Sequence, residues 1–250
     1  MTRVALITGG SRGIGRSIAE AFAREGLALA LAARRHEDVE AAARALRADG
    51  ARTMAITLDV GDADAATLAV SAVGAMLGPV DVLVNNAGIA ESAPIARTDL
   101  ELWERHMRTN VTGPFVLSRA VLPSMLERRW GRIINIASTA GLEGAPYLAA
   151  YTASKHALVG LTRALETETA GKGVTVNALC PGFTATDLVR RSAQKIMEKT
   201  GKNYDETVAA LARMNRGGRL IEPEEVAAVA VALLHDERSG DAIVVDGKES

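Results

Sequence analysis

The stretch that decides the fold lies at the start of the chain and reads Val4-Ala5-Leu6-Ile7-Thr8-Gly9-Gly10-Ser11-Arg12-Gly13-Ile14-Gly15. Its first five residues form an apolar run typical of a buried strand, and the glycine cluster leads directly into an amphipathic pattern. Glycines allow a close approach of the main chain to a pyrophosphate, and a helix start offers free N–H groups. A glycine cluster alone is often only a turn, but between a strand and a helix it predicts a dinucleotide phosphate site.

Short apolar runs and longer amphipathic segments continue to alternate along the chain. Strands are predicted at Val4–Thr8, Ala28–Ala33, Met54–Asp59, Val80–Asn85, Arg132–Ala137, Val174–Leu179 and Ala242–Val245. Helices are predicted at Arg16–Glu25, Val39–Asp49, Ala63–Leu77, Leu100–Glu127, Tyr151–Ala170 and Pro223–His235. The strands are apolar on both faces, which favours a sheet covered on both sides. The sequence therefore predicts one α/β domain over residues 1–250, a three-layer, doubly wound structure around a seven-stranded parallel sheet.

Residues 186–216 interrupt this alternation. They follow Pro181-Gly182, are largely polar and contain two amphipathic segments, Leu188–Lys199 and Tyr204–Met214. Because doubly wound sheets bind ligands outside the carboxyl ends of their strands, a helical excursion here predicts a small substrate lid. A surface decoration without a part in substrate binding is the alternative.

Composition and charge narrow the classes of function. The chain has 250 residues and a formal net charge of -1, which gives no case for nucleic acid or an anionic membrane as the main partner. No apolar stretch reaches about 18 residues, and the N-terminus lacks the pattern of a signal peptide. Cys180 is the only cysteine, which excludes an intrachain disulfide and favours a reducing, cytoplasmic compartment. The histidines are scattered without metal-ligand spacing, so no metal site is predicted.

A second motif lies in Tyr151-Thr152-Ala153-Ser154-Lys155, downstream of Ser138. Residues four apart share one face of a helix, so the phenol and the ammonium can point into one pocket. A nearby positive charge lowers the pKa of a phenol from about 10 and lets it exchange protons near neutral pH. Alone, such a pair is usually a surface contact, and its weight here comes from the residues that accompany it.

Together these residues resemble the short-chain dehydrogenase/reductase family. The glycine spacing is G-x-x-x-G-x-G, and the further matches are Asp59-Val60, Asn85-Asn86-Ala87-Gly88, Asn110 in the predicted helix Leu100–Glu127, and Pro181-Gly182-Phe183-Thr184-Ala185-Thr186. The matches extend over nearly the whole chain. The resemblance implies a Rossmann fold and an oxidoreductase that transfers a hydride between a nicotinamide coenzyme and a ketone or secondary alcohol.

The resemblance also implies a role for each of four side chains. Tyr151 is expected to be the general acid in carbonyl reduction and the base in alcohol oxidation. Lys155 is expected to bond the nicotinamide ribose and lower the pKa of Tyr151, and Ser138 is expected to hold the substrate oxygen beside the phenol. Asn110 is expected to fix a water that links Lys155 to solvent.

The coenzyme is expected to be NADP(H). At the end of the second strand an acidic residue binds the ribose 2′-hydroxyl of NAD, whereas arginines accept the 2′-phosphate of NADP. This chain has Ala33-Arg34-Arg35 there and Arg12 in the glycine loop, although arginines that open a helix are also found as ordinary solvated charges. The residues expected to contact the coenzyme are Gly9, Gly10, Ser11, Arg12, Gly13, Ile14, Gly15, Arg34, Arg35, Asp59, Val60, Asn86, Ala87, Gly88, Tyr151, Lys155, Pro181, Gly182, Thr184 and Thr186.

Within the family the chain looks most like the 3-oxoacyl thioester reductases, through Thr8–Arg12, Ser138–Gly141 and Pro181–Thr186. Reduction of a coenzyme A or carrier-protein thioester is therefore the leading expectation. The segment after Gly182 is longer than in compact fatty-acid reductases, so a free secondary alcohol, hydroxy acid or polyketide is the alternative substrate. A sensor or scaffold that binds NADPH without turnover is the non-enzymatic alternative. The family also implies a homotetramer.

Overall fold

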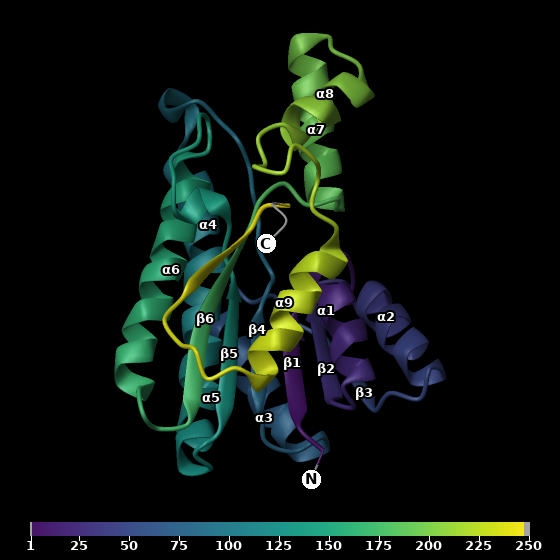
Figure 1. Ribbon diagram of the computed structural model, residues 1–250, viewed down its shortest axis with the longest axis vertical. Coiled ribbons are helices and arrows are strands. Elements are labelled where there is room, and N and C mark those ends of the chain that lie inside the picture. Colours follow the sequence, from purple (N-terminus) through teal and green to yellow (C-terminus); the bar gives the residue numbers. More distant parts are fainter. Residues whose placement is uncertain (1, 248–250) are drawn as a thin grey trace.

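The computed structural model describes residues 2–247, in which seven parallel strands form one sheet of order β3-β2-β1-β4-β5-β6-β7 (Figure 1). The strands are β1 (Val4–Thr8), β2 (Ala28–Ala33), β3 (Thr53–Thr57), β4 (Val82–Asn85), β5 (Gly131–Ile136), β6 (Val174–Pro181) and β7 (Ala242–Val245). The helices are α1 (Gly13–Arg24), α2 (His36–Ala48), α3 (Ala63–Met76), α4 (Leu100–Met107), α5 (Gly113–Glu127), α6 (Ala149–Thr169), α7 (Asp187–Thr200), α8 (Tyr204–Ala212) and α9 (Pro223–His235). The predicted parallel, doubly wound sheet is confirmed. Met1 and residues 248–250 of the predicted domain lie outside the described residues.

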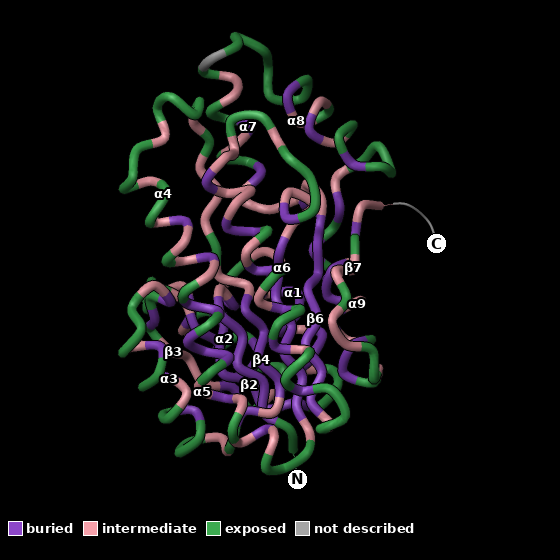
Figure 2. The backbone as a smooth tube through the Cα atoms, turned by 90° about the vertical axis from the view of Figure 1, so that its left-hand side faces the viewer, coloured by how far each residue is buried: buried purple, intermediate pink, exposed green. Residues whose placement is uncertain are grey.

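Two apolar clusters, one on each face of the sheet, make the three layers. One face is covered by α1, α2 and α9, whose buried side chains include Phe22, Leu46 and Leu233. On the other face α3 and α5 supply Val73, Leu117 and further side chains, and α6 adds to them. The most deeply buried part of the chain is the set of central strands (Figure 2). Each face of the sheet packs against helices, which explains why the strands are apolar on both faces.

The predicted helix Leu100–Glu127 is wrong in one respect. The segment is helical throughout but divides into α4, a π-helical stretch over Arg108–Thr112, and α5. Pro114 has no N–H to donate to the carbonyl of Asn110 four residues earlier, so an α-helical hydrogen bond cannot form at that point. Single π turns of this kind often occur at functional sites.

The strand order places the site. The strands that follow β1 are added on one side of it as β2 and β3, and on its other side from β4 onward. The strand order thus reverses between β1 and β4, and doubly wound sheets bind their ligands at this switch point. The loops that leave β1 and β4 are joined there: the Thr8 hydroxyl donates to the Val84 carbonyl at 3.3 Å and accepts from the Asn86 amide at 3.0 Å.

The expected excursion forms two helices, α7 and α8, which stand above the carboxyl ends of the strands (Figure 1). Val189, Ala193 and Leu211 hold them together in a small apolar cluster of their own. Asn203 is the N-cap of α8, and its side chain accepts a hydrogen bond from the Glu206 amide at 2.8 Å. Among the described residues, none of the helices is both long and apolar enough to cross a bilayer.

Candidate functional site

The glycine loop is braced from below by one side chain. Asn86 Nδ2 donates to the carbonyls of Thr8 and Gly9, at 2.8 and 3.2 Å. A Cβ atom at Gly9, whose φ is 65°, would lie 2.6 Å from this nitrogen, and one at Gly15 would lie 2.4 Å from it. The loop therefore needs glycine at both positions. Asn86 was expected as a coenzyme contact, and its bracing of the loop is a role that the sequence did not indicate.

The start of α1 fits a phosphate group. Its N-cap residue is Arg12, an extended residue whose side chain makes no capping hydrogen bond to the described residues. Because the Arg12 side chain does not cap them, the first amide groups of α1 can bind an anion. The positive end of the helix dipole at the same place also favours an anion. Thr186, at the base of the lid, lies 3.2 Å from where a Cβ of Gly13 would be. The lid therefore begins directly at the glycine loop.

The basic residues expected to select the coenzyme lie beside this loop. The Gly10 amide donates to the Ala32 carbonyl at 3.3 Å, which ties the end of β2 to the glycine loop. Arg34 and Arg35 follow β2 and are exposed, as is Arg12. Arg35 pairs with Asp38 at 3.4 Å, and Arg12 pairs with Asp187 of α7 at 3.7 Å. Exposed pairs of this length are weak and exchange readily with an anionic ligand.

Two of the expected coenzyme contacts follow β3. Asp59 is exposed, and its Oδ1 accepts from the Gly61 amide at 2.9 Å. Val60 is buried and belongs to the apolar cluster under α5. The main chain there lies close to α5, since a Cβ at Gly113 would lie only 2.6 Å from the Val60 carbonyl oxygen. The side chain of Val60 therefore packs in the core, which leaves only its main chain for a ligand.

The loop after β6 is held by a residue that sequence reasoning missed. Asn215 Oδ1 accepts from the Phe183 amide at 2.8 Å, and Asn215 Nδ2 donates to the Phe183 carbonyl at 2.9 Å. Gly182 fits because a Cβ there would lie 2.2 Å from Asn215 Oδ1. Thr184 is buried and bridges to Ile221. The expected contacts Pro181, Gly182, Thr184 and Thr186 thus lie on the chain from the end of β6 to the start of α7, which Asn215 and Ile221 hold in place.

Tyr151, Lys155 and Ser138 converge at the carboxyl ends of β5 and β6. Tyr151 and Lys155 lie one turn apart on α6, and Ser138 follows β5. Lys155 is only 5% exposed, and its Nζ donates to the Ile136 carbonyl at 2.7 Å. A Cβ at Gly88 would lie 3.6 Å from this Nζ, so the ammonium borders the loop after β4. The amine is therefore buried beside the predicted coenzyme loop.

The net shift of the Tyr151 pKa is a rise, not the lowering that the sequence predicts. Burial raises the pKa of Tyr151 above its ordinary value, and the contact with the Ser138 side chain only moderates that rise. Burial also lowers the pKa of Lys155 to about 8, while the Cys180 thiol partly offsets that change. The Lys155 Nζ lies 5.8 Å from the centroid of the Tyr151 ring. Desolvation is the largest cause of both shifts, because burial disfavours the charged form of each group.

Cys180 lies behind the same group of residues. Burial raises the pKa of its thiol to about 11, although a hydrogen bond from the Ser138 main chain and the nearby Lys155 ammonium lower it. The side chain is fully buried in a small apolar cluster with Ala137, Leu158 and Ala178. The thiol therefore stays protonated at neutral pH and serves as a packing residue under Ser138.

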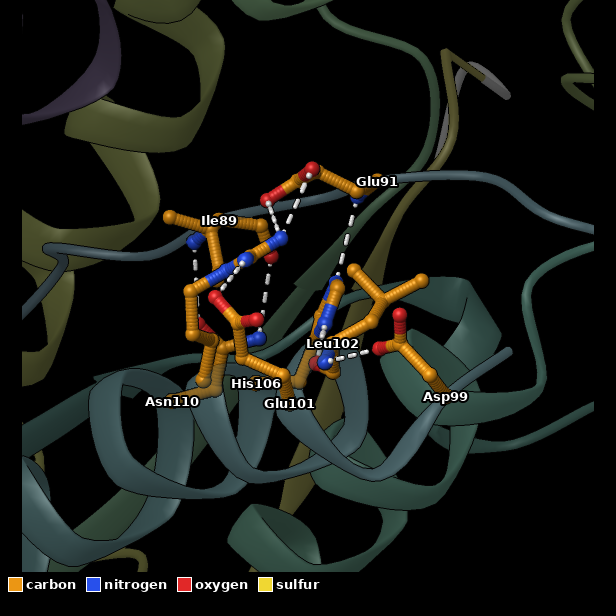
Figure 3. Close-up of polar contacts among 8 residues, drawn as sticks. Ile89, Glu91, Asp99, Glu101, Leu102, His106 and Asn110 are labelled. Carbon is orange, nitrogen blue, oxygen red and sulfur yellow. Dashed lines mark hydrogen bonds and ion pairs between the residues drawn. The ribbon is translucent and has the colours of Figure 1, made fainter. Parts of the chain in front are cut away.

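Asn110 joins the π turn to the loop after β4. Its Oδ1 accepts from the Ile89 amide at 2.9 Å, and its Nδ2 donates to the Ile89 carbonyl at 3.0 Å (Figure 3). The same Nδ2 also donates to Ser154 Oγ at 2.9 Å. Ser154 lies between Tyr151 and Lys155 on α6. The side chain of Asn110 thus fixes the loop against α6, and its expected role in holding a water stays a prediction.

Sequence reasoning also missed His106, one turn before Asn110. It is fully buried on α4, and its ring meets the Tyr151 ring edge to face, with 6.3 Å between centroids and 73° between planes. Its Nε2 lies 3.1 Å from the Glu91 amide nitrogen (Figure 3). Its sequence neighbours give no sign of a contact with Tyr151, which lies 45 positions away, so only the fold reveals that contact.

Known proteins resemble this chain over nearly its whole length. The pattern of the short chain dehydrogenase family matches residues 3–197. An acetoacetyl-CoA reductase of Shinella zoogloeoides is 38% identical over 250 residues, which cover 99% of this chain and 98% of that protein. A Streptomyces virginiae protein assigned as the ketoacyl reductase of the monensin polyketide synthase is 42% identical over 241 residues, 94% of this chain and 91% of its own length.

Solved structures agree with these relatives. A crystal structure of a variant of actinorhodin polyketide ketoreductase with NADPH has a TM-score of 0.94 to this chain at 37% identity, and it covers 98% of this chain and 96% of that one. The agreement extends from the glycine loop through the lid, since so little of either chain is left unmatched. On the family pattern and on this similarity, the chain belongs to the short-chain dehydrogenase family.

Proposed function

We propose that the chain is an NADPH-dependent oxidoreductase that reduces the ketone of a 3-oxoacyl thioester to a secondary alcohol. The observation that carries the proposal is the meeting of three groups at the carboxyl ends of β5 and β6: the Tyr151 phenol, the Ser138 hydroxyl that contacts it, and the buried Lys155 ammonium. Lys155 also borders the loop after β4, which leaves the switch point of the sheet together with the glycine loop.

The side chains divide the chemistry between them. When bound, the nicotinamide supplies the hydride. A phenol is protonated at neutral pH, burial raises the pKa of Tyr151 further, and its hydroxyl can donate a proton to the carbonyl oxygen. The Ser138 hydroxyl holds that oxygen, where negative charge develops. The Lys155 ammonium favours the phenolate that donation leaves behind, which eases the transfer.

The proposed coenzyme is NADPH rather than NADH. Arg12, Arg34 and Arg35 are exposed around the end of β2, and the neutral Ala33 stands where an acid would select NAD. The solved actinorhodin polyketide ketoreductase variant contains NADPH. The coenzyme phosphates would rest on the amides of Gly9–Gly15 at the start of α1.

A coenzyme A or carrier-protein thioester is the proposed substrate, because an acetoacetyl-CoA reductase is 38% identical over nearly the full chain. A polyketide is the second candidate, favoured by the high similarity to a polyketide ketoreductase. We also propose a cytoplasmic homotetramer. The free thiol of Cys180 suits a reducing compartment, and α4 and α5 expose large apolar side chains: Leu100, Trp103 and Phe115.

A substrate panel tests the proposal. NADPH oxidation is followed with acetoacetyl-CoA, with small ketones and with bulky cyclic ketones, using Tyr151→Phe as the blank. We expect the highest kcat/KM with acetoacetyl-CoA. A preference for bulky cyclic ketones would show that the substrate is a polyketide and not a small 3-oxoacyl thioester. NADPH binding without oxidation by any carbonyl would leave only the sensor or scaffold.

A further inference from the structure

Residues 89–93, which follow β4, make hydrogen bonds to other parts of the chain at every second position. The 89–93 segment is held at Ile89 by both polar atoms of the Asn110 side chain. It is held at Glu91 by His106, and at Ala93, whose amide donates to the Tyr147 carbonyl at 2.9 Å. Tyr147 has a left-handed φ of 63°, which is rare for a residue with a side chain and costs conformational energy.

The tautomer of His106 follows from its two partners. Nδ1 lies 2.8 Å from the Leu102 carbonyl, which can only accept a hydrogen bond, so Nδ1 carries the proton. Nε2 lies 3.1 Å from the Glu91 main-chain nitrogen, which can only donate, so Nε2 offers its lone pair. Both ring nitrogens are thus used, and the neutral Nδ1–H form is the one that satisfies both contacts (Figure 3).

The same ring also contacts the proposed acid. It meets Tyr151 edge to face at a centroid distance of 6.3 Å, within the range of favourable aromatic pairs. His106 is therefore a buried link between the 89–93 segment and the phenol ring. It lies behind the phenol and reaches no reacting atom itself.

A second, exposed contact reinforces the link. The Glu91 carboxylate accepts from Arg105 Nη2 with both oxygens at 3.2 Å, and Glu101 accepts from Arg105 Nη1 at 3.0 Å. These pairs are partly open to solvent and contribute little on their own. The buried His106 contact is the one that water cannot replace.

We propose that His106 is a positioning residue for the carbonyl substrate: as the Nδ1–H tautomer it fixes the 89–93 segment, which would flank the ketone beside Tyr151. The inference rests on the proposed function for its effect on the substrate, but the tautomer and the fixed segment can be tested without it. A fixed segment limits the orientations of the ketone, so losing it raises KM more than it lowers kcat.

Three variants separate the hydrogen bond from the packing. His106→Phe keeps an aromatic edge against Tyr151 but accepts nothing from Glu91. His106→Gln can still accept from that amide. The matched control is His156→Phe on α6, because His156 Nδ1 lies 3.0 Å from the Thr152 carbonyl in the same helical geometry, but its side chain is exposed.

Kinetics give the first readout. We expect His106→Phe to raise the KM for the ketone about tenfold with kcat changed less than about threefold, and to leave NADPH binding unchanged. His106→Gln should recover most of the KM, and His156→Phe should match wild type. Equal KM values for all of these proteins would overturn the inference.

Two readouts do not depend on turnover. In wild-type protein labelled with ¹⁵N-histidine, the His106 signals should report a protonated Nδ1 and an unprotonated Nε2. Deuterium exchange of the peptide that covers residues 89–93 should be slow in wild type and His106→Gln and fast in His106→Phe. If His106→Phe does not fold, the inference is tested by the tautomer of His106 in wild type and by deuterium exchange of residues 89–93 in His106→Gln. An Nε2–H tautomer, or fast exchange in wild type, contradicts the inference even in an active enzyme. Slow exchange and the Nδ1–H tautomer without any turnover would refute only the proposed function.

Discussion

At the scale of single residues, the site depends on how much water the fold leaves around Lys155. The ammonium is buried against the Ile136 carbonyl, and its pKa falls to about 8 from an ordinary 10.5. Its charged form therefore costs stability at neutral pH. The ammonium thus lies beside the loop after β4 and away from bulk water, and its bond to the coenzyme ribose stays a prediction.

This cost predicts a pH dependence of stability. Between pH 8 and 10.5 the unfolded chain keeps a proton on Lys155 that the folded chain has lost, so this group makes the unfolding free energy rise with pH. Relative to Lys155→Met, wild type should gain about 2 kcal/mol between pH 7.5 and 10. Urea unfolding of both proteins at the two pH values measures the difference. A constant difference would mean that Lys155 has its ordinary pKa in the folded protein.

The coenzyme preference is also set by single residues. Arg34 is exposed at the end of β2, where a guanidinium can pair with the 2′-phosphate. We expect Arg34→Ala to reduce the ratio of kcat/KM for NADPH over NADH about 10- to 100-fold, the effect of one lost charge-assisted hydrogen bond. Arg24→Ala, an equally exposed arginine at the end of α1, is the control. An unchanged ratio in Arg34→Ala would assign the 2′-phosphate to other residues.

At the scale of elements, the π turn between α4 and α5 decides where Asn110 points. Pro114 removes the α-helical bond to the Asn110 carbonyl, and the side chain of Asn110 then reaches Ile89 and Ser154. Neither the loop after β4 nor α6 would be fixed in this way by a regular helix, in which each residue advances by a constant angle.

Substituting the proline tests this. We expect Pro114→Ala to restore an amide donor, to favour a regular helix and to turn Asn110 away from Ile89, which should lower kcat about tenfold to a hundredfold. Pro123→Ala, at the proline inside α5, is the matched control and should leave kcat unchanged. Circular dichroism verifies that both variants stay folded. Wild-type kcat in folded Pro114→Ala would show that the proline does not set the position of Asn110.

The elements also show how far sequence alone could go. The alternating apolar pattern predicted all seven strands within about two residues, because burial on both faces leaves a signal in every strand. The π turn was missed, since Pro114 so close to the start of a helix is an ordinary helical residue by pattern. His106 and Asn215 were missed because their partners, Glu91 and Phe183, are main-chain groups that any sequence carries. The raised pKa of Tyr151 was missed because desolvation depends on neighbours distant in sequence.

At the scale of the whole molecule, two apolar cores hold the sheet from both sides, while the lid has a separate small cluster. The lid therefore contributes little to the cores and connects to the glycine loop through the exposed pair of Arg12 and Asp187. Elements that move when a ligand binds are often such weakly held parts of a fold, so a part of the lid in substrate binding stays a prediction.

The exposed face of α4 and α5 carries the prediction on assembly. Phe115 is 43% exposed and Leu100 is 76% exposed, which is costly for large apolar side chains in a monomer. We expect wild type to sediment as a tetramer and Phe115→Lys to sediment as a smaller species with its far-ultraviolet circular dichroism unchanged. Leu68→Lys, on the exposed side of α3, is the control and should leave the mass unchanged. A tetramer in Phe115→Lys would move the interface elsewhere.

The central claim is that the Tyr151 phenol donates the proton to a ketone beside bound NADPH. It is tested most directly by comparing wild type with Tyr151→Phe in two measurements on the same samples: the quenching of protein fluorescence by NADPH, and single-turnover oxidation of NADPH with acetoacetyl-CoA. Loss of a positioned general acid should slow turnover about 10²- to 10⁴-fold and leave the Kd for NADPH within about twofold. Turnover by Tyr151→Phe within about tenfold of wild type, at equal NADPH saturation, would contradict the account.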